Sequence, residues 1–488
     1  MSHNSKINSV APSAAYDFLK KLWGFSLATW ISALIGFLSI PFTTRLFSTE
    51  VVGQNNMFTV YLTFFMMIAY LGIDQAYTRF YNEQAGNRKN VLFNTSICTA
   101  LLMVCFLGVL IFLAGSYISR EVSGYTNTFV PICIILSLFG NVLLRFFSIS
   151  YRMANKIVAY TIIVVLISVI GKLSYLLVAL WEPSHFNVIW TMTLGYLVTG
   201  IVYGAIYLKK DSTNRLVDKD LLFPALKFGL PLVPATILSW LNSSIPQLML
   251  NKYVGYSAIG IYSNAVVITS ILSLLQGGFN TYWVPFVYEN YQHSAQKIHK
   301  VHNLITLSMT LLGLFIVLGQ DIIYLVLGED FRSSKIFFSF LLMAPICYTI
   351  AETTGLGISI SKKTYLNLWI FGVTMLVNAG FCCFLLPLMG IEGAAISVAV
   401  SSLVMLMMKT WIGERYYKCV DSYWKTTVAL LLVLLAATAN LLFFEKIVFR
   451  YVSILFLIVL LLGVYRKEVD YLCAVLKGLP LWYYVKCK

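Results

Sequence analysis

Charged residues are scarce in this sequence. Only 11% of its 488 residues are Asp, Glu, Lys or Arg, whereas 59% are hydrophobic. A soluble domain of ordinary composition has about 25% charged residues, so this chain lacks the polar surface that such a domain needs. A long polar segment is also missing, because the longest stretch outside the apolar runs, about residues 209–225, is too short to be a domain. These absences exclude a water-soluble globular protein.

Motifs of catalysis are absent as well. The sequence contains no Gly-x-x-x-x-Gly-Lys phosphate loop and no His-Glu-x-x-His zinc motif, so we predict a protein that is not an enzyme and does not use ATP directly. His299 and His302 have no carboxylate or cysteine partner nearby in the sequence, and no metal site or other cofactor is expected. Any energy that the protein requires would come from an ion gradient, of protons or sodium, or from the gradient of its own substrate.

Apolar runs long enough to cross a bilayer fill most of the chain. A hydrocarbon core of about 30 Å requires roughly 20 mostly apolar residues per helix. The sequence therefore predicts an all-α integral membrane protein with about fourteen transmembrane helices. The expected spans are 22–46, 53–73, 92–117, 128–150, 158–181, 186–208, 227–249, 258–284, 302–326, 335–360, 366–388, 391–412, 426–444 and 447–465.

The basic residues are distributed unequally between the two sides of this topology. With a cytoplasmic N-terminus, 26 of the 35 lysines and arginines fall in cytoplasmic segments and 7 in outer ones, as the positive-inside rule requires. Both termini are therefore predicted to be cytoplasmic. The net charge of +15 is explained by this bias, and its dispersal over many short loops excludes a nucleic-acid partner. None of the nine cysteines lies in a predicted outer loop, so no disulfide framework is expected.

The sequence also contains an internal repeat. Ser39-Ile40-Pro41 followed by Gly53 is echoed by Ser244-Ile245-Pro246 followed by Gly260, at an offset of about 205 to 207 residues. Because an even number of spans separates the copies, the repeats are expected to be parallel. We predict an N-terminal six-helix bundle over residues 1–210, a second six-helix bundle over 211–420 around a central cavity, and two further helices with a cytoplasmic tail over 421–488.

Ionisable groups within predicted spans or close to their ends are the candidate site residues, because burying a charge in a bilayer is costly. One interpretation is that cations in the cavity bind an anionic substrate, with Glu352 or Asp74 as counter-ion or proton site. The alternative is structural ion pairing, of Lys172 with Glu352 or of Asp74 with a neighbouring arginine. The candidate cations are Lys172, Arg145, Arg152, Arg79 and Lys227.

Four prolines inside or near spans are candidates for gating. Pro41 lies in the first span, and Pro231, Pro234 and Pro246 all lie in the seventh. A proline inside a helix removes one backbone hydrogen bond and permits a kink. These kinks either allow motion or serve static packing, and the sequence leaves both interpretations open.

Several segments together resemble a known transporter family. They are Leu71-Gly72-Ile73-Asp74 with Arg79-Phe80-Tyr81, Phe228-Gly229-Leu230-Pro231, Gly260-Ile261-Tyr262-Ser263-Asn264, Trp283-Val284-Pro285-Phe286, and Asn378 with Gly390-Ile391-Glu392-Gly393. In order and spacing the chain resembles the Wzx-type polysaccharide flippases, in the superfamily that includes the MATE drug exporters and the lipid II flippase.

The resemblance implies both a mechanism and a substrate. It implies alternating access and transfer of a polyprenyl-diphosphate-linked oligosaccharide, an O-antigen or capsular repeat unit, across the bacterial inner membrane. Expected partners are this lipid-linked substrate, membrane lipids, and polysaccharide polymerase and chain-length proteins of lipopolysaccharide or capsule biosynthesis. The alternative is a MATE-like exporter of organic cations, which would prefer acidic cavity residues. A membrane-embedded polymerase or ligase is disfavoured, because no predicted outer loop is long.

Overall fold

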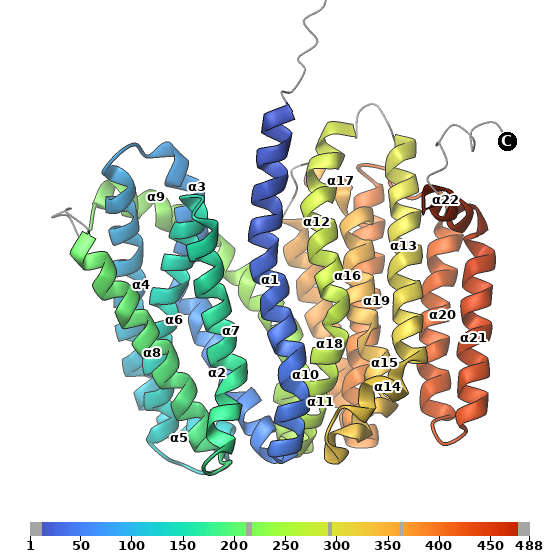
Figure 1. The fold of residues 1–488 in the computed structure, drawn as a ribbon, viewed down its shortest axis with the longest axis horizontal. Helices are drawn as coiled ribbons and strands as arrows, with labels where there is room; N and C mark the ends of the chain where they lie inside the picture. Colours follow the sequence, from blue (N-terminus) through green and yellow to red (C-terminus); the bar gives the residue numbers. More distant parts are fainter. Residues whose placement is uncertain (1–11, 211–216, 291–294, 362, 364, 477–488) are drawn as a thin grey trace, which may run out of the picture. The chain divides into compact units, whose positions relative to one another are not determined.

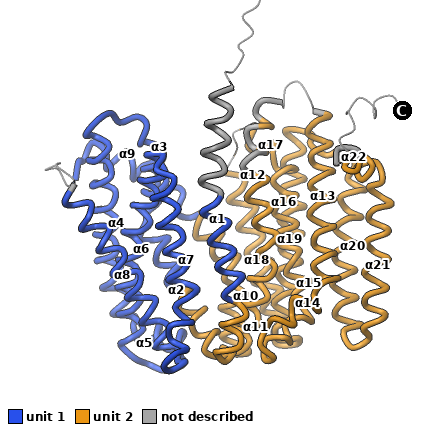
Figure 2. Tube along the Cα trace, in the orientation of Figure 1, with its two compact units in different colours: residues 1–39, 61–234 blue, residues 40–60, 235–488 orange. Residues whose placement is uncertain are grey.

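The computed structural model describes residues 12–210, 217–290, 295–361, 363 and 365–476. All regular elements of these residues are helices (Figure 1). This follows from the apolar composition, because a chain in hydrocarbon must satisfy its backbone hydrogen bonds within each segment. The helices group into two compact units, unit 1 (residues 1–39 and 61–234) and unit 2 (residues 40–60 and 235–488) (Figure 2).

Unit 1 is built around helix α6, which packs against α4, α7 and α8. Small residues permit this close packing: a Cβ added to Gly140 of α6 would lie 2.5 Å from the backbone of Tyr196 in α8. Ser137 and Thr193 also share a hydrogen bond of 2.9 Å between these helices. The elements of the N-terminal part are α1 (Pro12–Leu46), α2 (Thr49–Tyr70), α3 (Ile73–Phe80), η1 (Tyr81–Glu83), α4 (Arg88–Leu113), α5 (Gly115–Ser123), α6 (Phe129–Met153), α7 (Ile157–Ala179), α8 (His185–Lys210), α9 (Lys219–Gly229) and η2 (Leu230–Leu232).

In unit 2, helix α16 packs against α13 and α19, and α18 packs along α19. His302 of α13 joins two other helices, because its ring nitrogens lie 2.7 Å from Thr353 Oγ1 of α16 and 2.9 Å from Thr426 Oγ1 of α20. The elements of the C-terminal part are α10 (Val233–Tyr253), α11 (Tyr256–Thr269), α12 (Ile271–Asn290), α13 (Ala295–Leu318), α14 (Gln320–Leu325), η3 (Glu329–Ile336), α15 (Phe338–Leu341), α16 (Met343–Thr354), α17 (Leu356–Ile360), α18 (Leu366–Met389), α19 (Ile391–Glu414), α20 (Tyr423–Leu442), α21 (Ile447–Val464) and α22 (Arg466–Leu476).

The number of membrane-crossing helices agrees with the predicted fold class. Within the described residues, 11 helices are long and apolar enough to span a bilayer, and the number rises to 14 if each of three bent pairs counts as one span. The bent pairs correspond to the predicted spans at 53–73, 258–284 and 335–360. Their bends of 48°, 42° and 64° are not visible in hydropathy, which measures only composition. The proposed division at residues 1–210, 211–420 and 421–488 stays a prediction.

Candidate functional site

Asp74 and Arg145 form an ion pair inside unit 1. Arg145 of α6 donates from Nη2 to Asp74 Oδ2 at 2.7 Å and from Nε to the same oxygen at 3.2 Å. The Asp74 side chain is 7% exposed, whereas that of Arg145 is 45% exposed. The carboxylate is therefore the buried member of the pair, whereas the guanidinium is partly open and its Nη1 has no hydrogen-bond partner among the residues that the structure describes. Asp74 thus pairs with an arginine, which is compatible with both predicted interpretations, a counter-ion of a substrate-binding cation and a structural ion pair.

A sharp turn places Asp74 in this position. Leu71 and Gly72 adopt left-handed backbone conformations, with φ of 49° and 68°, and they separate α2 from α3. Asp74 then lies in the first turn of α3, where the helix dipole favours a negative charge. Gly72 also lies directly on Gly229, since a Cβ at Gly72 would be 2.3 Å from the Gly229 carbonyl oxygen. The turn at Leu71-Gly72 and the segment at Phe228-Gly229, both singled out in the sequence, are thus one packing contact.

Aromatic rings complete the surroundings of Arg145. Its guanidinium carbon lies 5.8 Å from the centre of the Tyr70 ring, within the range of a cation–π contact. The Tyr70 hydroxyl is buried without a hydrogen-bond partner among the described residues. This cluster therefore contains a held cation and an unused hydroxyl in a mainly apolar bundle, and both groups can bind an anionic or hydroxyl-bearing ligand.

Unit 2 contains a second buried ion pair, between Glu352 and Lys409. Lys409 Nζ of α19 lies 3.3 Å from Glu352 Oε1 of α16, and it also lies 5.9 Å from the centre of the Phe371 ring. The side chains are 11% and 33% exposed respectively. Lys409 is one of the 26 basic residues that the predicted topology assigns to cytoplasmic segments, so sequence reasoning missed this pair. The signal that could have identified it is its position inside a 24-residue apolar helix.

The other predicted cations are not members of these two ion pairs. Arg79 of α3 pairs with Glu83 one turn along the chain, and both side chains are about half exposed. Lys172 of α7, Arg152 at the end of α6 and Lys227 of α9 are exposed, and none has an ion-pair partner within the described residues. The roles of all these residues in substrate binding stay predictions.

The four predicted gating prolines lie in or beside two helices. Pro41 is inside α1, and Pro246 is buried inside α10. Pro231 lies in the short 3-10 turn η2, and Pro234 is the second residue of α10. Pro41 and Pro234 also lie close to the points where the chain passes from one unit to the other, at Ser39–Ile40 and Pro234–Ala235.

Two glycines related by the predicted repeat face each other inside unit 2. A Cβ added to Gly53 of α2 would lie 1.9 Å from the Tyr256 carbonyl oxygen, and a Cβ added to Gly260 of α11 would lie 2.1 Å from the Thr49 carbonyl oxygen. Both pairs of matching positions are separated by about 207 residues. The contact is therefore reciprocal, in the way that a two-fold axis produces.

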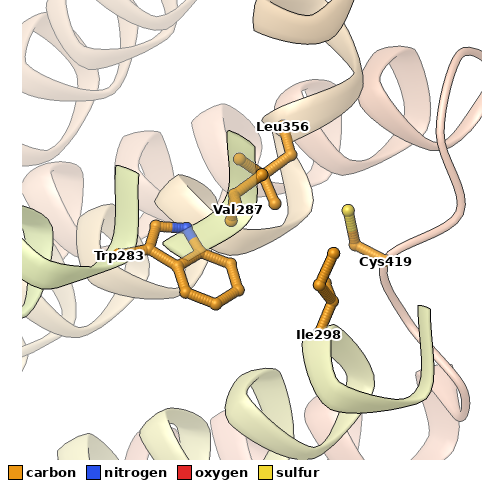
Figure 3. Packing of buried hydrophobic residues seen from close by; sticks show 5 residues of the cluster. All are labelled: Trp283, Val287, Ile298, Leu356 and Cys419. Atoms are coloured by element: carbon orange, nitrogen blue, oxygen red, sulfur yellow. The ribbon is translucent and has the colours of Figure 1, made fainter. Parts of the chain in front are cut away.

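Trp283 links the Glu352 region to a small apolar cluster. Its indole Nε1 donates to the Glu352 carbonyl oxygen at 3.1 Å. As Figure 3 shows, its ring belongs to a packed group near the ends of several helices, formed with Val287, Ile298, Leu356 and Cys419. This contact fixes α12 against α16 and explains why a tryptophan stands in the segment Trp283-Val284-Pro285-Phe286. Among the residues that the structure describes, no group of three or more His, Cys, Asp or Glu could hold a metal ion.

Comparison with known proteins identifies the family. The model of the family described as "Polysaccharide biosynthesis protein" matches residues 18–291, which is more than half of the chain. A protein of the Lsg locus of Haemophilus influenzae is 21% identical over 326 residues, covering 64% of this chain and 77% of that protein. The capsular polysaccharide biosynthesis protein CapF of Staphylococcus aureus is 22% identical over 197 residues, or 38% of this chain and about half (49%) of that relative.

A solved structure shares the fold. The lipid II flippase MurJ in an inward closed conformation superposes with a TM-score of 0.63 at 15% sequence identity, covering 91% of this chain and 99% of MurJ. This similarity supports the all-α architecture predicted from the sequence. On the strength of the match over residues 18–291, the chain belongs to the polysaccharide biosynthesis protein family.

Proposed function

We propose that this protein is a flippase that moves polyprenyl-diphosphate-linked oligosaccharide repeat units across the bacterial plasma membrane. The observation that carries the proposal is the Arg145 guanidinium, held by a buried carboxylate in an apolar bundle and open on one side. Family membership and the fold shared with a lipid II flippase support it. The substrate would be an O-antigen or capsular repeat unit, and no catalytic step is part of the mechanism.

The chemistry of the diphosphate suits the Arg145 site. A guanidinium binds phosphate oxygens through charge-assisted hydrogen bonds with fixed geometry. In the substrate-free protein Asp74 occupies Nε and Nη2, which orients the guanidinium and leaves Nη1 for the first contact with a ligand. The neighbouring Tyr70 hydroxyl can donate a further hydrogen bond. Lys172, Arg152, Arg79 and Lys227 are proposed as additional cations on the path of the substrate.

Asp74 and Glu352 are proposed to couple the return of the protein to its substrate-free state to ion binding. Asp74 and Glu352 each neutralise a cation in the substrate-free protein. When an anionic substrate takes over a cation, the released carboxylate becomes a site for a proton or a sodium ion. Such an exchange would couple transport to an ion gradient, because the ion binds only when the carboxylate loses its basic partner.

Alternating access requires helices that bend where the chain passes between the two units. Three such crossings lie at Ser39–Ile40, Val60–Tyr61 and Pro234–Ala235. Pro41 lies beside the first and Pro234 at the third, and each lacks the backbone N–H that a continuous helix would use. We propose these two prolines as hinges, with Pro231 and Pro246 adjusting the path of the seventh span.

The membrane setting follows from the charge bias. Both termini would be cytoplasmic, because the basic residues concentrate on that side of the predicted topology. The lipid tail of the substrate would stay in the bilayer during transfer. Polymerase and chain-length proteins, which use the repeat unit on the outer side, are the expected protein partners.

The proposal is tested in a strain that lacks the gene. Surface polysaccharide should be lost, while lipid-linked repeat units accumulate on the cytoplasmic leaflet. Expression of the wild-type chain should correct both defects. So should the Arg88→Gln variant, which changes an exposed arginine at the start of α4. Normal polysaccharide in the deletion strain, combined with drug sensitivity that the wild-type chain cures, would instead identify an exporter of the MATE type.

A further inference from the structure

A groove that the proposed transport cycle does not use runs between α19 and α20 in unit 2. It has a volume of about 540 Å³, within the range of about 300–1,000 Å³ typical of ligand sites. One half of the groove is apolar, with α19 and α20 each contributing three side chains at helical spacing. These are Leu403, Leu406 and Met407, and Leu430, Leu431 and Leu434.

The length of the groove matches one leaflet of a bilayer. Its lining on α19 extends from Leu403 to Glu414, which is about 17 Å at 1.5 Å per residue. Half of a hydrocarbon core of about 30 Å is about 15 Å. A fatty acyl chain anchored at the membrane surface therefore matches the length of the groove, whereas a ligand that crosses the whole membrane is longer than its lining.

The polar end of the groove lies where α19 ends and α20 begins. The Thr410 hydroxyl donates a hydrogen bond to Thr354 Oγ1 there at 2.9 Å. The Glu414 carboxylate is already occupied inside the protein, because it accepts hydrogen bonds from the backbone N–H groups of Cys419 and Val420 at 2.8 and 3.1 Å. It also accepts one from the Tyr423 hydroxyl at 2.8 Å. Glu414 therefore has little capacity left for a ligand.

Arg415 is the charged group at this end with donors to spare. Its guanidinium carbon lies 3.6 Å from the centre of the Trp411 ring, so the planar group is stacked and its edge is open. Arg415 is exposed, and it has no ion-pair partner among the residues that the structure describes. The combination of an apolar channel one leaflet deep and a stacked, unneutralised arginine at its mouth is complementary to an anionic lipid.

We propose that this groove binds one glycerophospholipid with an anionic head group, such as phosphatidylglycerol. One acyl chain would lie between the leucines of α19 and α20, and the phosphate would accept hydrogen bonds from Arg415. The predicted topology places this end of both helices at the cytoplasmic leaflet. The bound lipid is a resident of the protein rather than its transported cargo.

The test measures lipid retention by the purified full-length chain with native mass spectrometry. Phosphatidylglycerol and phosphatidylcholine with identical acyl chains are added in equal amounts. We expect one phosphatidylglycerol per chain and a preference over phosphatidylcholine of about fivefold, which corresponds to about 1 kcal/mol for one arginine at a membrane surface. Arg415→Gln should abolish the preference, Arg415→Lys should keep most of it, and the matched control Arg88→Gln should keep all of it.

A second variant tests the channel independently of charge. Leu430→Trp fills the apolar half and should reduce retention of both lipids while the protein stays monodisperse. An unchanged preference in Arg415→Gln, or unchanged retention in Leu430→Trp, would overturn the proposal. Displacement of phosphatidylglycerol by an equal amount of polyprenyl phosphate would also overturn it and would assign the groove to the substrate. Because the readout is lipid retention, it is independent of whether transport itself is measured.

Discussion

Replacement of Arg145 is the most direct perturbation of the proposed mechanism. Arg145→Gln removes the charge and the planar set of guanidinium donors but keeps a shorter, polar side chain. A charge-assisted hydrogen bond contributes about 1.5–3 kcal/mol. Because the Arg145 side chain is 45% exposed, solvent screening reduces this to about 1–2 kcal/mol. The variant should therefore lose about 5- to 30-fold in affinity for the diphosphate.

The charge and the geometry of Arg145 can be separated with a second variant. Arg145→Lys keeps the charge but offers a point donor instead of a planar fork, and it cannot bond Asp74 through two nitrogens. We expect a loss of about two- to fivefold, clearly smaller than for the glutamine variant. An equal loss in both variants would show that the bidentate geometry matters more than the charge.

The assay combines binding with transport. Binding of a polyprenyl diphosphate to purified protein reports affinity, and complementation of the deletion strain at low expression reports transport. Lys156→Gln, at the predicted cytoplasmic end beside α7, is the matched control that removes one positive charge elsewhere. Wild-type binding and transport by Arg145→Gln, in protein that is expressed normally, would refute the assignment of Arg145 to the substrate site.

Three further outcomes follow from the structure. Arg450→Gln should lower the free energy of unfolding by about 1.5–3 kcal/mol, measured by thermal denaturation in detergent, because Arg450 is 1% exposed and donates to Asp321 at 2.6 Å, while Asp321 keeps Lys335 as a second partner. A loss below about 0.5 kcal/mol would contradict this. Gly260→Leu should abolish transport or expression, whereas Gly372→Leu, where a Cβ meets open space, should be tolerated. If both variants are expressed and transport equally well, the close contact between Gly53 and Gly260 is not required. Burial, followed by the nearby Glu414 carboxylate, raises the pKa of the Cys419 thiol. The free energy of unfolding should therefore decrease as pH rises above about 8.5, where cysteine ionises in the unfolded chain. Cys419→Ala should remove this part of the pH dependence, and a variant with the same pH profile as the wild type would argue against the raised pKa.

Sequence reasoning succeeded where the controlling interaction is local. The predicted spans 426–444 and 447–465 are separated only by Glu445 and Lys446, and the structure has the break at residues 443–446. The bend after α2 was not predicted, although Gly72 was part of a named segment. A left-handed pair of residues is stabilised there by the contact with Gly229, about 157 residues away in the chain. Hydropathy is averaged over neighbouring residues in the sequence, so it cannot indicate a contact between distant segments.

The candidate site shows the same division between local and distant interactions. Asp74, Arg145 and Glu352 could be singled out because a charge in an apolar run is costly wherever the run packs. Their partners could not be chosen from the sequence. Lys409 is 57 residues from Glu352, and only the packing of α16 against α19 brings the two together. Lys172, which has the same type of isolated position in its span, is exposed and has no such partner in the described chain.

The sequence by itself determined the class of protein, the approximate number of spans and the residues worth testing. These depend on the length and polarity of each segment, because a helix in hydrocarbon satisfies its backbone hydrogen bonds internally and needs no distant partner for them. The tertiary structure alone decided which charges are paired, which glycines meet and where the groove beside Arg415 lies. Those features depend on side-chain contacts between helices, and the order of residues in one helix does not specify which face of another it will meet.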